Sequence, residues 1–350
     1  MRIAQVAPLY EAVPPRLYGG TERVVAHLTD ALVTLGHDVT LFSSAEARTL
    51  AKLAVVRDQA IRLDPAPLKS DLAAHLNQLA EVRQRAGEFD VIHFHTDMIQ
   101  FPMFADMAER TITTLHGRLD LKDLPEVYRR WPQFPLVSIS DDQRRPLPFA
   151  NWAATVHHGM NTDLYRFSPR SEGYLAFLGR ISPEKRPDRA IAIATAAGRP
   201  LRIAAKVDNA DRAYFEATIE PLLANPLVDF VGEIGDGAKS AFLGGADALL
   251  FPIDWPEPFG LVMIEAMACG TPVIAWENGS VPEVIEHGLT GFIVNSEAEA
   301  REAVGRLPEL DRRAIRARFE ERFSATAMAQ RYLEIYHRLP QAVRTLTEAA

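Results

Sequence analysis

The chain has 350 residues, of which 47% are hydrophobic and 24% are charged, and its formal net charge is −8. This composition is that of a globular protein long enough for two domains, and the negative charge gives no electrostatic case for nucleic-acid binding. The single cysteine, Cys269, excludes an intrachain disulfide. The sequence contains no run of about 18 apolar residues, so it predicts no membrane-spanning helix. Because the first residues favour a strand over a signal peptide, we expect a cytoplasmic protein.

The chain opens with the pattern of a parallel α/β domain. Residues 3–7 predict a buried strand, apolar residues recur at helical spacing over 24–35, and residues 38–42 predict the next strand. Gly19 and Gly20 stand before this helix, where the absence of Cβ atoms would let backbone N–H groups approach a phosphate closely. The residues alone fit an ordinary strand-to-helix turn equally well, because no G-x-G-x-x-G fingerprint is present.

Polar residues follow the next predicted strands of the first half. His95 and Asp97 come at the end of a strand over 89–95, and His116 follows a strand over 111–115. Because a doubly wound sheet builds its site at the carboxyl ends of its strands, these side chains are candidates for a functional cleft, near which His95 and Asp97 could form a pair. A histidine at a strand end is more often structural, so the residues alone leave these roles open.

A polar stretch over 160–173 marks a domain boundary, after which the alternation of strands and helices restarts. Strands are predicted at 174–178, 201–205, 228–231, 248–252, 272–275 and 291–294. The chain therefore predicts two doubly wound α/β domains that face each other across a cleft.

The stretch 254–279 includes the carboxylates Glu257 and Glu265, with seven residues between them. We expect residues 259–262 to form the first turn of a short apolar helix. The N–H groups of such a turn are unpaired and carry partial positive charge, so a diphosphate or a sugar hydroxyl could bind there. Two carboxylates at different depths could accept hydrogen bonds from two polyols, such as a sugar ring and a ribose.

A basic loop, GRISPEK, follows the predicted strand at 174–178 and carries Arg180 and Lys185. These two cations suit a diphosphate that becomes a leaving group, although a solvated basic loop would explain them as well. The chain has neither an Asp-x-Asp pair nor a Cys/His cluster with metal-ligand spacing. We therefore expect Arg180, Lys185 and helix N-termini to neutralise the diphosphate without a metal or another cofactor.

Three motifs together carry a family resemblance. The stretch from Glu257 to Ile274, EPFGLVMIEAMACGTPVI, resembles the E-x7-E signature of the retaining glycosyltransferases of family 4, which have the GT-B fold. The GRISPEK loop matches the G-R-x4-K motif of that family, and TTLHG, which contains His116, matches its T-x-L-H-G stretch. One departure is Arg186, where the family often has glycine. The resemblance covers about residues 2–340.

The resemblance implies a domain organisation. It predicts an acceptor-side Rossmann-like domain over 1–165, a nucleotide-sugar-binding Rossmann-like domain over 166–325, and a C-terminal helix within 326–350 that returns to the first domain.

The resemblance also assigns roles to residues. His116, Arg180, Lys185 and Glu257 would be the catalytic residues: the two cations would stabilise the diphosphate, Glu257 would hold sugar hydroxyls, and His116 would orient the sugar from the other domain. Glu265 would accept hydrogen bonds from the ribose. The other donor-binding residues would be Gly19, Gly20, Ile234, Phe259, Gly260 and Leu261. His95 and Asp97 are candidates for the acceptor side.

The implied function is retaining transfer of a hexose to a hydroxyl acceptor in exopolysaccharide or glycoconjugate synthesis. UDP-glucose or another UDP-sugar is the expected donor, GDP-mannose is the alternative, and a GT-B sugar-nucleotide epimerase or a binding protein without turnover are the other classes to separate. The acceptor could be a carbohydrate, a lipid-linked sugar or a small molecule. Contact with a membrane would be peripheral at most, through the basic-aromatic end of residues 122–131.

Overall fold

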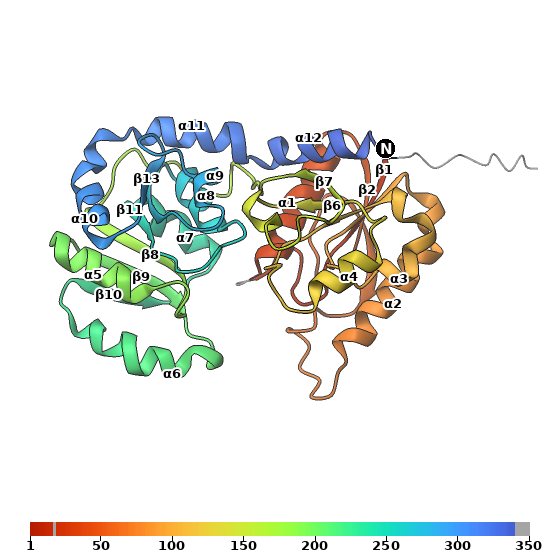
Figure 1. Ribbon diagram of the computed structural model, residues 1–350, viewed down its shortest axis with the longest axis horizontal. Helices are drawn as coiled ribbons and strands as arrows, with labels where there is room; N and C mark the ends of the chain where they lie inside the picture. The colour runs from red at the N-terminus through yellow and green to blue at the C-terminus, as the bar shows by residue number, and fades with distance from the viewer. Residues whose placement is uncertain (17–18, 340–350) are drawn as a thin grey trace, which may run out of the picture. The chain divides into compact units, whose positions relative to one another are not determined.

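The computed structural model describes residues 1–16 and 19–339, and the chain divides into two compact units (Figure 1). The first unit combines Met1–Ile139, Arg144–Gly159 and the segment that begins at Ala325, and the second comprises Ser140–Gln143 and Met160–Ser324. The chain thus leaves the first unit, builds the second, and returns. The last part of the predicted C-terminal segment, residues 340–350, lies outside the described residues.

A seven-stranded parallel sheet forms the centre of the first unit. Its strands are β1 (Arg2–Val6), β2 (Asp38–Ser44), β3 (Lys52–Arg57), β4 (Val91–Phe94), β5 (Thr111–Thr114), β6 (Leu136–Ser138) and β7 (Trp152–Thr155). The spatial order is β3-β2-β1-β4-β5-β6-β7, so the direction of winding reverses between β1 and β4. Ligands of open α/β sheets bind at such a switch point. The sequence prediction missed β3, which lies at the sheet edge and is only partly buried.

Helices cover this sheet on both faces, as a parallel sheet requires. They are α1 (Gly20–Thr34), α2 (Asp71–Gln84), α3 (Phe101–Phe104), α4 (Leu124–Arg130) and α12 (Ala325–Tyr336). The last helix of the described chain, α12, packs against α1 (Figure 1). Its buried side includes Met328, Tyr332 and Tyr336, so this helix completes the core of the first unit.

The second unit has a six-stranded parallel sheet of the same doubly wound kind. Its strands are β8 (Tyr174–Arg180), β9 (Leu201–Lys206), β10 (Val228–Gly232), β11 (Ala246–Phe251), β12 (Val273–Trp276) and β13 (Gly291–Val294). Their spatial order is β10-β9-β8-β11-β12-β13, which places the switch point between β8 and β11.

The helices of the second unit are α5 (Pro187–Ala197), α6 (Arg212–Tyr214), α7 (Asp236–Gly244), α8 (Leu261–Ala268), α9 (Val281–Val284), α10 (Glu297–Arg306) and α11 (Arg312–Phe323). Helix α10 packs against α5, and helix α11 packs against α8. Almost every side chain of α8 is apolar, and the helix is buried accordingly. The predicted fold class, two doubly wound Rossmann-like units, is confirmed.

Within residues 1–16 and 19–339, no helix has both the length and the apolar character needed to cross a lipid bilayer.

Candidate active site

The second unit joins two of the predicted motifs at its switch point. Lys185 lies in the loop after β8, and Glu257 lies in the loop after β11. The Lys185 Nζ donates a hydrogen bond to the Glu257 Oε2, and Trp255 Nε1 donates to the same oxygen at 3.0 Å. The Glu257 side chain is only 13% exposed, so the ion pair is largely shielded from water. A shielded pair of this kind has a stronger mutual attraction than an exposed one.

Hydrogen bonds from two serines to its carbonyl groups hold the backbone of the Glu257 loop in place. Ser280 N–H donates to the Glu257 carbonyl at 3.0 Å, Ser280 Oγ donates to the Phe259 carbonyl at 2.7 Å, and Ser140 Oγ donates to the Pro258 carbonyl at 2.6 Å. With three consecutive carbonyls anchored, the loop holds the Glu257 carboxylate in one place.

Two glycines shape the same loop. Gly260 has φ 77° and precedes α8, and Gly279 has φ 57° and lies against the backbone of Glu257. A Cβ at Gly279 would lie 2.3 Å from the Glu257 nitrogen, so only glycine fits there. The expected helical turn over 259–262 is partly wrong: α8 begins at Leu261, because left-handed Gly260 is its N-cap. In the part of the chain that the structure describes, no side chain caps the start of α8.

Glu265 extends from α8 and is 4% exposed. Its carboxylate accepts a hydrogen bond from the Nζ of Lys239 on α7 at 3.2 Å, and Lys239 also lies 3.5 Å from Asp236. No motif in the sequence marks Lys239, because its partner is 26 residues away on another helix. Glu265 is therefore a buried, charge-paired acceptor.

Arg180 ends β8, as predicted, but its partners are carboxylates. Its guanidinium donates to Glu184 at 2.6 Å and lies 3.4 Å from Asp211 and 4.0 Å from Asp208. Because these contacts leave the Arg180 side chain 33% exposed, an incoming anion could replace a carboxylate there.

Arg186, which departs from the family pattern, adopts the left-handed conformation that glycine favours, with φ 53°. Its guanidinium donates to Asp188 at 2.8 Å and to Asp254 at 3.0 Å. These charged hydrogen bonds offset the backbone strain of about 1–2 kcal/mol, so the loop closes without glycine.

In the first unit, the glycine pair lies where α1 begins. Gly20 is the first residue of α1, and Gly19 precedes it with φ 152°. A Cβ at Gly19 would come within 2.7 Å of the Pro15 Cβ, so this position requires glycine. Among the residues that the structure describes, no side chain caps α1, and the start of a helix is a place where an anion can bind.

The predicted histidines His95 and His116 come together at the carboxyl ends of β4 and β5. His95 Nδ1 lies 2.9 Å from His116 Nε2, and the His116 ring stacks on His158 with centroids 5.2 Å apart. Burial lowers the pKa of His95 well below its usual value and that of His116 to about 3, so both rings are neutral near pH 7.

The suggested pairing of His95 with Asp97 is wrong. Both ring nitrogens of His95 are occupied, Nδ1 by His116 and Nε2 by the Oε1 of Gln5 at 2.8 Å. Asp97 is exposed in the loop that follows, with φ 55°. The acceptor-side role of these two residues stays a prediction.

Ile234 lies in the short segment between β10 and α7 and is partly exposed. Its predicted place beside the nucleotide base stays a prediction.

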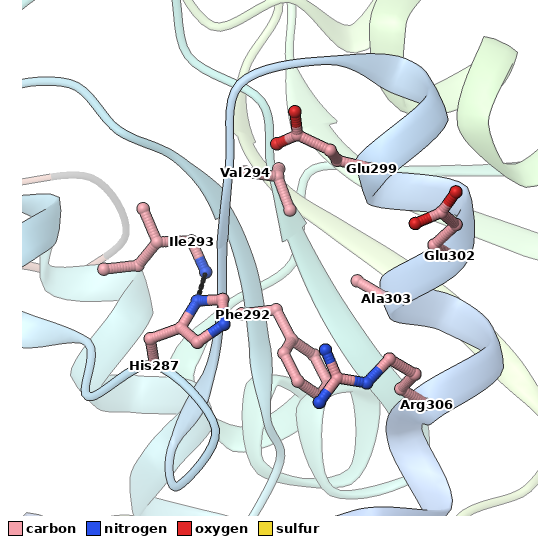
Figure 2. A pocket seen from close by; sticks show the side chains of 8 residues that line it. All are labelled: His287, Phe292, Ile293, Val294, Glu299, Glu302, Ala303 and Arg306. Carbon is pink, nitrogen blue, oxygen red and sulfur yellow. Dashed lines mark hydrogen bonds between the residues drawn. The ribbon is translucent and has the colours of Figure 1, made fainter.

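A separate small pocket lies between β13 and α10 (Figure 2). There the Arg306 guanidinium covers the Phe292 ring at 4.7 Å, and the Ile293 N–H donates to His287 Nδ1 at 3.1 Å. The pocket contains none of the predicted site residues.

The second unit thus offers two shielded carboxylates, Glu257 and Glu265, each paired with a lysine, and such groups can bind the hydroxyls of a polyol. Among the described residues, no group of three or more His, Cys, Asp or Glu side chains is arranged to hold a metal ion.

The fold places the chain in the GT-B class of glycosyltransferases. It superposes with a TM-score of 0.75 on the crystal structure of a glycosyltransferase involved in avilamycin A biosynthesis, with 25% identity over 97% of this chain and 98% of that one. The fold also matches the Anabaena protein HepE, solved with UDP and glucose, with a TM-score of 0.71 and 21% identity over 95% and 98% of the two chains.

Sequence comparison narrows the class. The model for Glycosyltransferase Family 4 matches residues 18–209, and that for Glycosyl transferases group 1 matches residues 166–322. The chain belongs to glycosyltransferase family 4, as its motifs predicted.

Two mycobacterial relatives show the breadth of this family. The phosphatidyl-myo-inositol mannosyltransferase of Mycobacterium leprae is 26% identical over 96% of both chains. The D-inositol 3-phosphate glycosyltransferase of Mycobacterium tuberculosis is 27% identical over 71% of this chain, but the match spans only 60% of that relative.

Proposed function

We propose that this glycosyltransferase transfers a hexose from a UDP-sugar to a hydroxyl acceptor with retention of configuration. The observation that carries the proposal is the Lys185–Glu257 ion pair beside the start of α8, with Glu265 on the same helix. One carboxylate four residues before the first residue of the helix and another four residues after it can accept hydrogen bonds from two different polyols. A sugar nucleotide carries such polyols, its sugar and its ribose, on either side of a diphosphate.

In this proposal the departing diphosphate takes its compensating charge from the protein. Lys185, Arg180 and the first N–H groups of α8 would stabilise the negative charge that develops as the bond to the sugar breaks. Glu257 would hold sugar hydroxyls and Glu265 would hold the ribose. Catalysis would then need no metal ion, and a chelator would leave the transfer rate unchanged.

Same-face attack accounts for the proposed retention. The acceptor oxygen bonds to the anomeric carbon on the face from which the diphosphate leaves, the bond from that carbon to the phosphate oxygen breaks, and the phosphate takes the acceptor proton. A glycosyl-enzyme adduct found by mass spectrometry during turnover would rule this route out.

The base and the sugar of the donor are the part of the proposal that experiment must decide. HepE, a protein of the same fold, was solved with UDP and with UDP-glucose, which makes UDP-glucose the first donor to test. The 26% identical relative is a mannosyltransferase, so GDP-mannose is the alternative. The inositol acceptors named for the mycobacterial relatives make inositol-containing lipids and phosphates acceptors to test beside saccharides. We expect these reactions to take place in the cytoplasm, in exopolysaccharide or glycoconjugate synthesis.

A thermal-shift series tests the donor class. The ligands are UDP, UDP-glucose, GDP and GDP-mannose, each with and without EDTA. A ligand at 100 times its dissociation constant adds about 2.7 kcal/mol to the free energy of unfolding, which is readily measured. A shift with UDP and UDP-glucose that EDTA does not change supports the proposal. A shift with guanine nucleotides alone selects the mannosyl alternative, and no shift with any of the four refutes an active donor site.

A further inference from the structure

His116 is the last member of a hydrogen-bonded chain that begins on α12. The Gln5 Nε2 donates to the Tyr336 hydroxyl at 3.2 Å, the Gln5 Oε1 lies 2.8 Å from His95 Nε2, and His95 Nδ1 lies 2.9 Å from His116 Nε2. Gln5 and Tyr336 are 0% exposed and His95 is 3% exposed. Because bulk water does not reach these groups, they must satisfy one another, and the proton positions along the chain are coupled.

The direction of the chain follows from what each atom can do. An amide oxygen only accepts, so His95 Nε2 must carry the proton that bonds to Gln5 Oε1. A neutral imidazole with a proton on Nε2 has a lone pair on Nδ1, so His95 accepts at that nitrogen. The proton shared by the two rings therefore belongs to His116 Nε2, and His116 Nδ1 keeps a lone pair.

The far end of the chain is consistent with this direction. Tyr336 accepts from Gln5, so its own proton is free to bond to His93 Nδ1 at 2.7 Å. His93 Nε2 then donates to Thr114 Oγ1 at 2.8 Å, and every member has a donor for each acceptor. Turning the Gln5 amide over would reverse all of these bonds together and would place a proton on His116 Nδ1.

The environment of His116 Nδ1 distinguishes the two directions. This atom is buried and has no hydrogen-bond partner in the described chain. A buried N–H without an acceptor is rarer in proteins than an unfilled acceptor, so the lone pair is the less costly occupant of this position. The same lone pair is what a sugar hydroxyl needs as a partner.

We propose that Gln5, acting through His95, is a positioning residue that fixes His116 with its proton on Nε2, so that Nδ1 accepts a hydrogen bond from a hydroxyl of the donor sugar. This inference rests on the proposed function for the identity of the ligand. It predicts that the position accepts a neutral hydroxyl and disfavours a carboxylate or a phosphate, which would place a second acceptor against the lone pair.

The proton positions can be measured without substrate. In protein labelled with ¹⁵N in the histidine rings, we expect His116 to show a protonated Nε2 and an unprotonated Nδ1 between about pH 5 and pH 8, the range in which an ordinary histidine would titrate. His116→Gln assigns the signal. A proton on His116 Nδ1 in the unaltered protein overturns the proposal, whatever any variant does.

Gln5→Met tests the coupling, because it keeps the volume of the side chain and removes the amide oxygen. We expect His116 to become a mixture of the two neutral forms, and sugar transfer to lose about threefold to tenfold in kcat/KM, as for one neutral hydrogen bond. The affinity for UDP, which carries no sugar, should stay unchanged. An unaltered His116 signal or an unaltered kcat/KM contradicts the proposal.

Tyr332→Phe is the matched control. Tyr332 lies on the same helix as Tyr336 and is equally buried, but its hydroxyl bonds to Thr114, at the end of the chain that lies beyond His93 and farthest from His116. We expect Tyr332→Phe to change neither the His116 signal nor kcat/KM. A change in either would mean that removing any buried hydroxyl of this core has the same effect as removing the Gln5 amide. A protein that binds no nucleotide would refute the proposed function instead, and the NMR result would still be read.

Discussion

Lys185 and Glu257 are 72 residues apart in the chain, yet the ammonium of one is hydrogen-bonded to the carboxylate of the other. The two groups form an ion pair whose side chains are only 21% and 13% exposed. A donor diphosphate would compete with Glu257 for Lys185, and sugar hydroxyls would compete with Lys185 for Glu257. Binding of the proposed donor would therefore exchange one set of charged hydrogen bonds for another.

Lys185→Ala should lower kcat/KM for sugar transfer by about 100-fold or more, the cost of removing one donor to charge that develops in a transition state. Steady-state kinetics with the identified donor measures this loss. Lys52→Ala is the control, because Lys52 also forms an ion pair, with Asp38 at 2.7 Å, but is 70% exposed in the first unit. Activity within twofold of the unaltered protein would remove Lys185 from the mechanism.

Glu265→Gln should weaken UDP binding by about tenfold, since a hydrogen bond to a charged group contributes about 1.5–3 kcal/mol. The affinity for inorganic pyrophosphate should stay the same, because it has no ribose. Isothermal titration calorimetry measures both. Glu302→Gln, on the exposed side of α10, controls for the loss of a carboxylate. If Glu265→Gln weakened the binding of UDP and of pyrophosphate equally, Glu265 would have no role at the ribose.

Gly279→Ala should displace the Glu257 loop and abolish most of the transfer activity, because its Cβ would lie 2.3 Å from the Glu257 nitrogen. Gly288→Ala is a close control. Gly288 has φ 79°, and a Cβ there would meet nothing within 4 Å, so this variant carries only the left-handed strain of about 1–2 kcal/mol. Thermal denaturation and kinetics of both variants separate strain from displacement. Equal activities would show that the Glu257 loop tolerates the shift.

Stability should fall as the pH decreases from 6.5 toward 4.5. Burial lowers the pKa values of His93, His95, His116 and His158 below the ordinary value of 6.5, so in this window these histidines bind protons in the unfolded chain but not in the folded one. Each can contribute a loss of about 1.4 kcal/mol per pH unit. Urea denaturation over this range measures the slope, and His116→Gln should reduce it. A flat profile would contradict the burial of these rings.

The sequence predicted most of the site in the second unit because its signals are local. Glu257, Glu265, Arg180 and Lys185 lie in short motifs, and the strands before them are apolar runs. Lys239 and the two aspartates near Arg180, Asp208 and Asp211, were missed, since those contacts join elements that only the folded sheet brings together.

The first unit shows the same limit more strongly. The strand ends placed His95 and His116 correctly at one edge of the sheet, but the interpretation paired His95 with its near neighbour Asp97. The actual partner of His95, Gln5, lies 90 residues away in the sequence. Gln5 is in turn bonded to Tyr336, from which it is separated by 331 residues. Nothing in the local pattern distinguishes a buried glutamine from any other polar residue of a strand.

The return of the chain to the first unit at Ala325 has a consequence for synthesis on the ribosome. Residues of α12 belong to the core of a unit whose strands have all been made by Gly159, so that core stays incomplete while about 165 further residues are translated. At about 5–20 residues per second, this delay is on the order of ten to thirty seconds. During that interval Gln5 and His93 lack their hydrogen bonds to the Tyr336 hydroxyl. We therefore expect the incomplete first unit to be a substrate for chaperones.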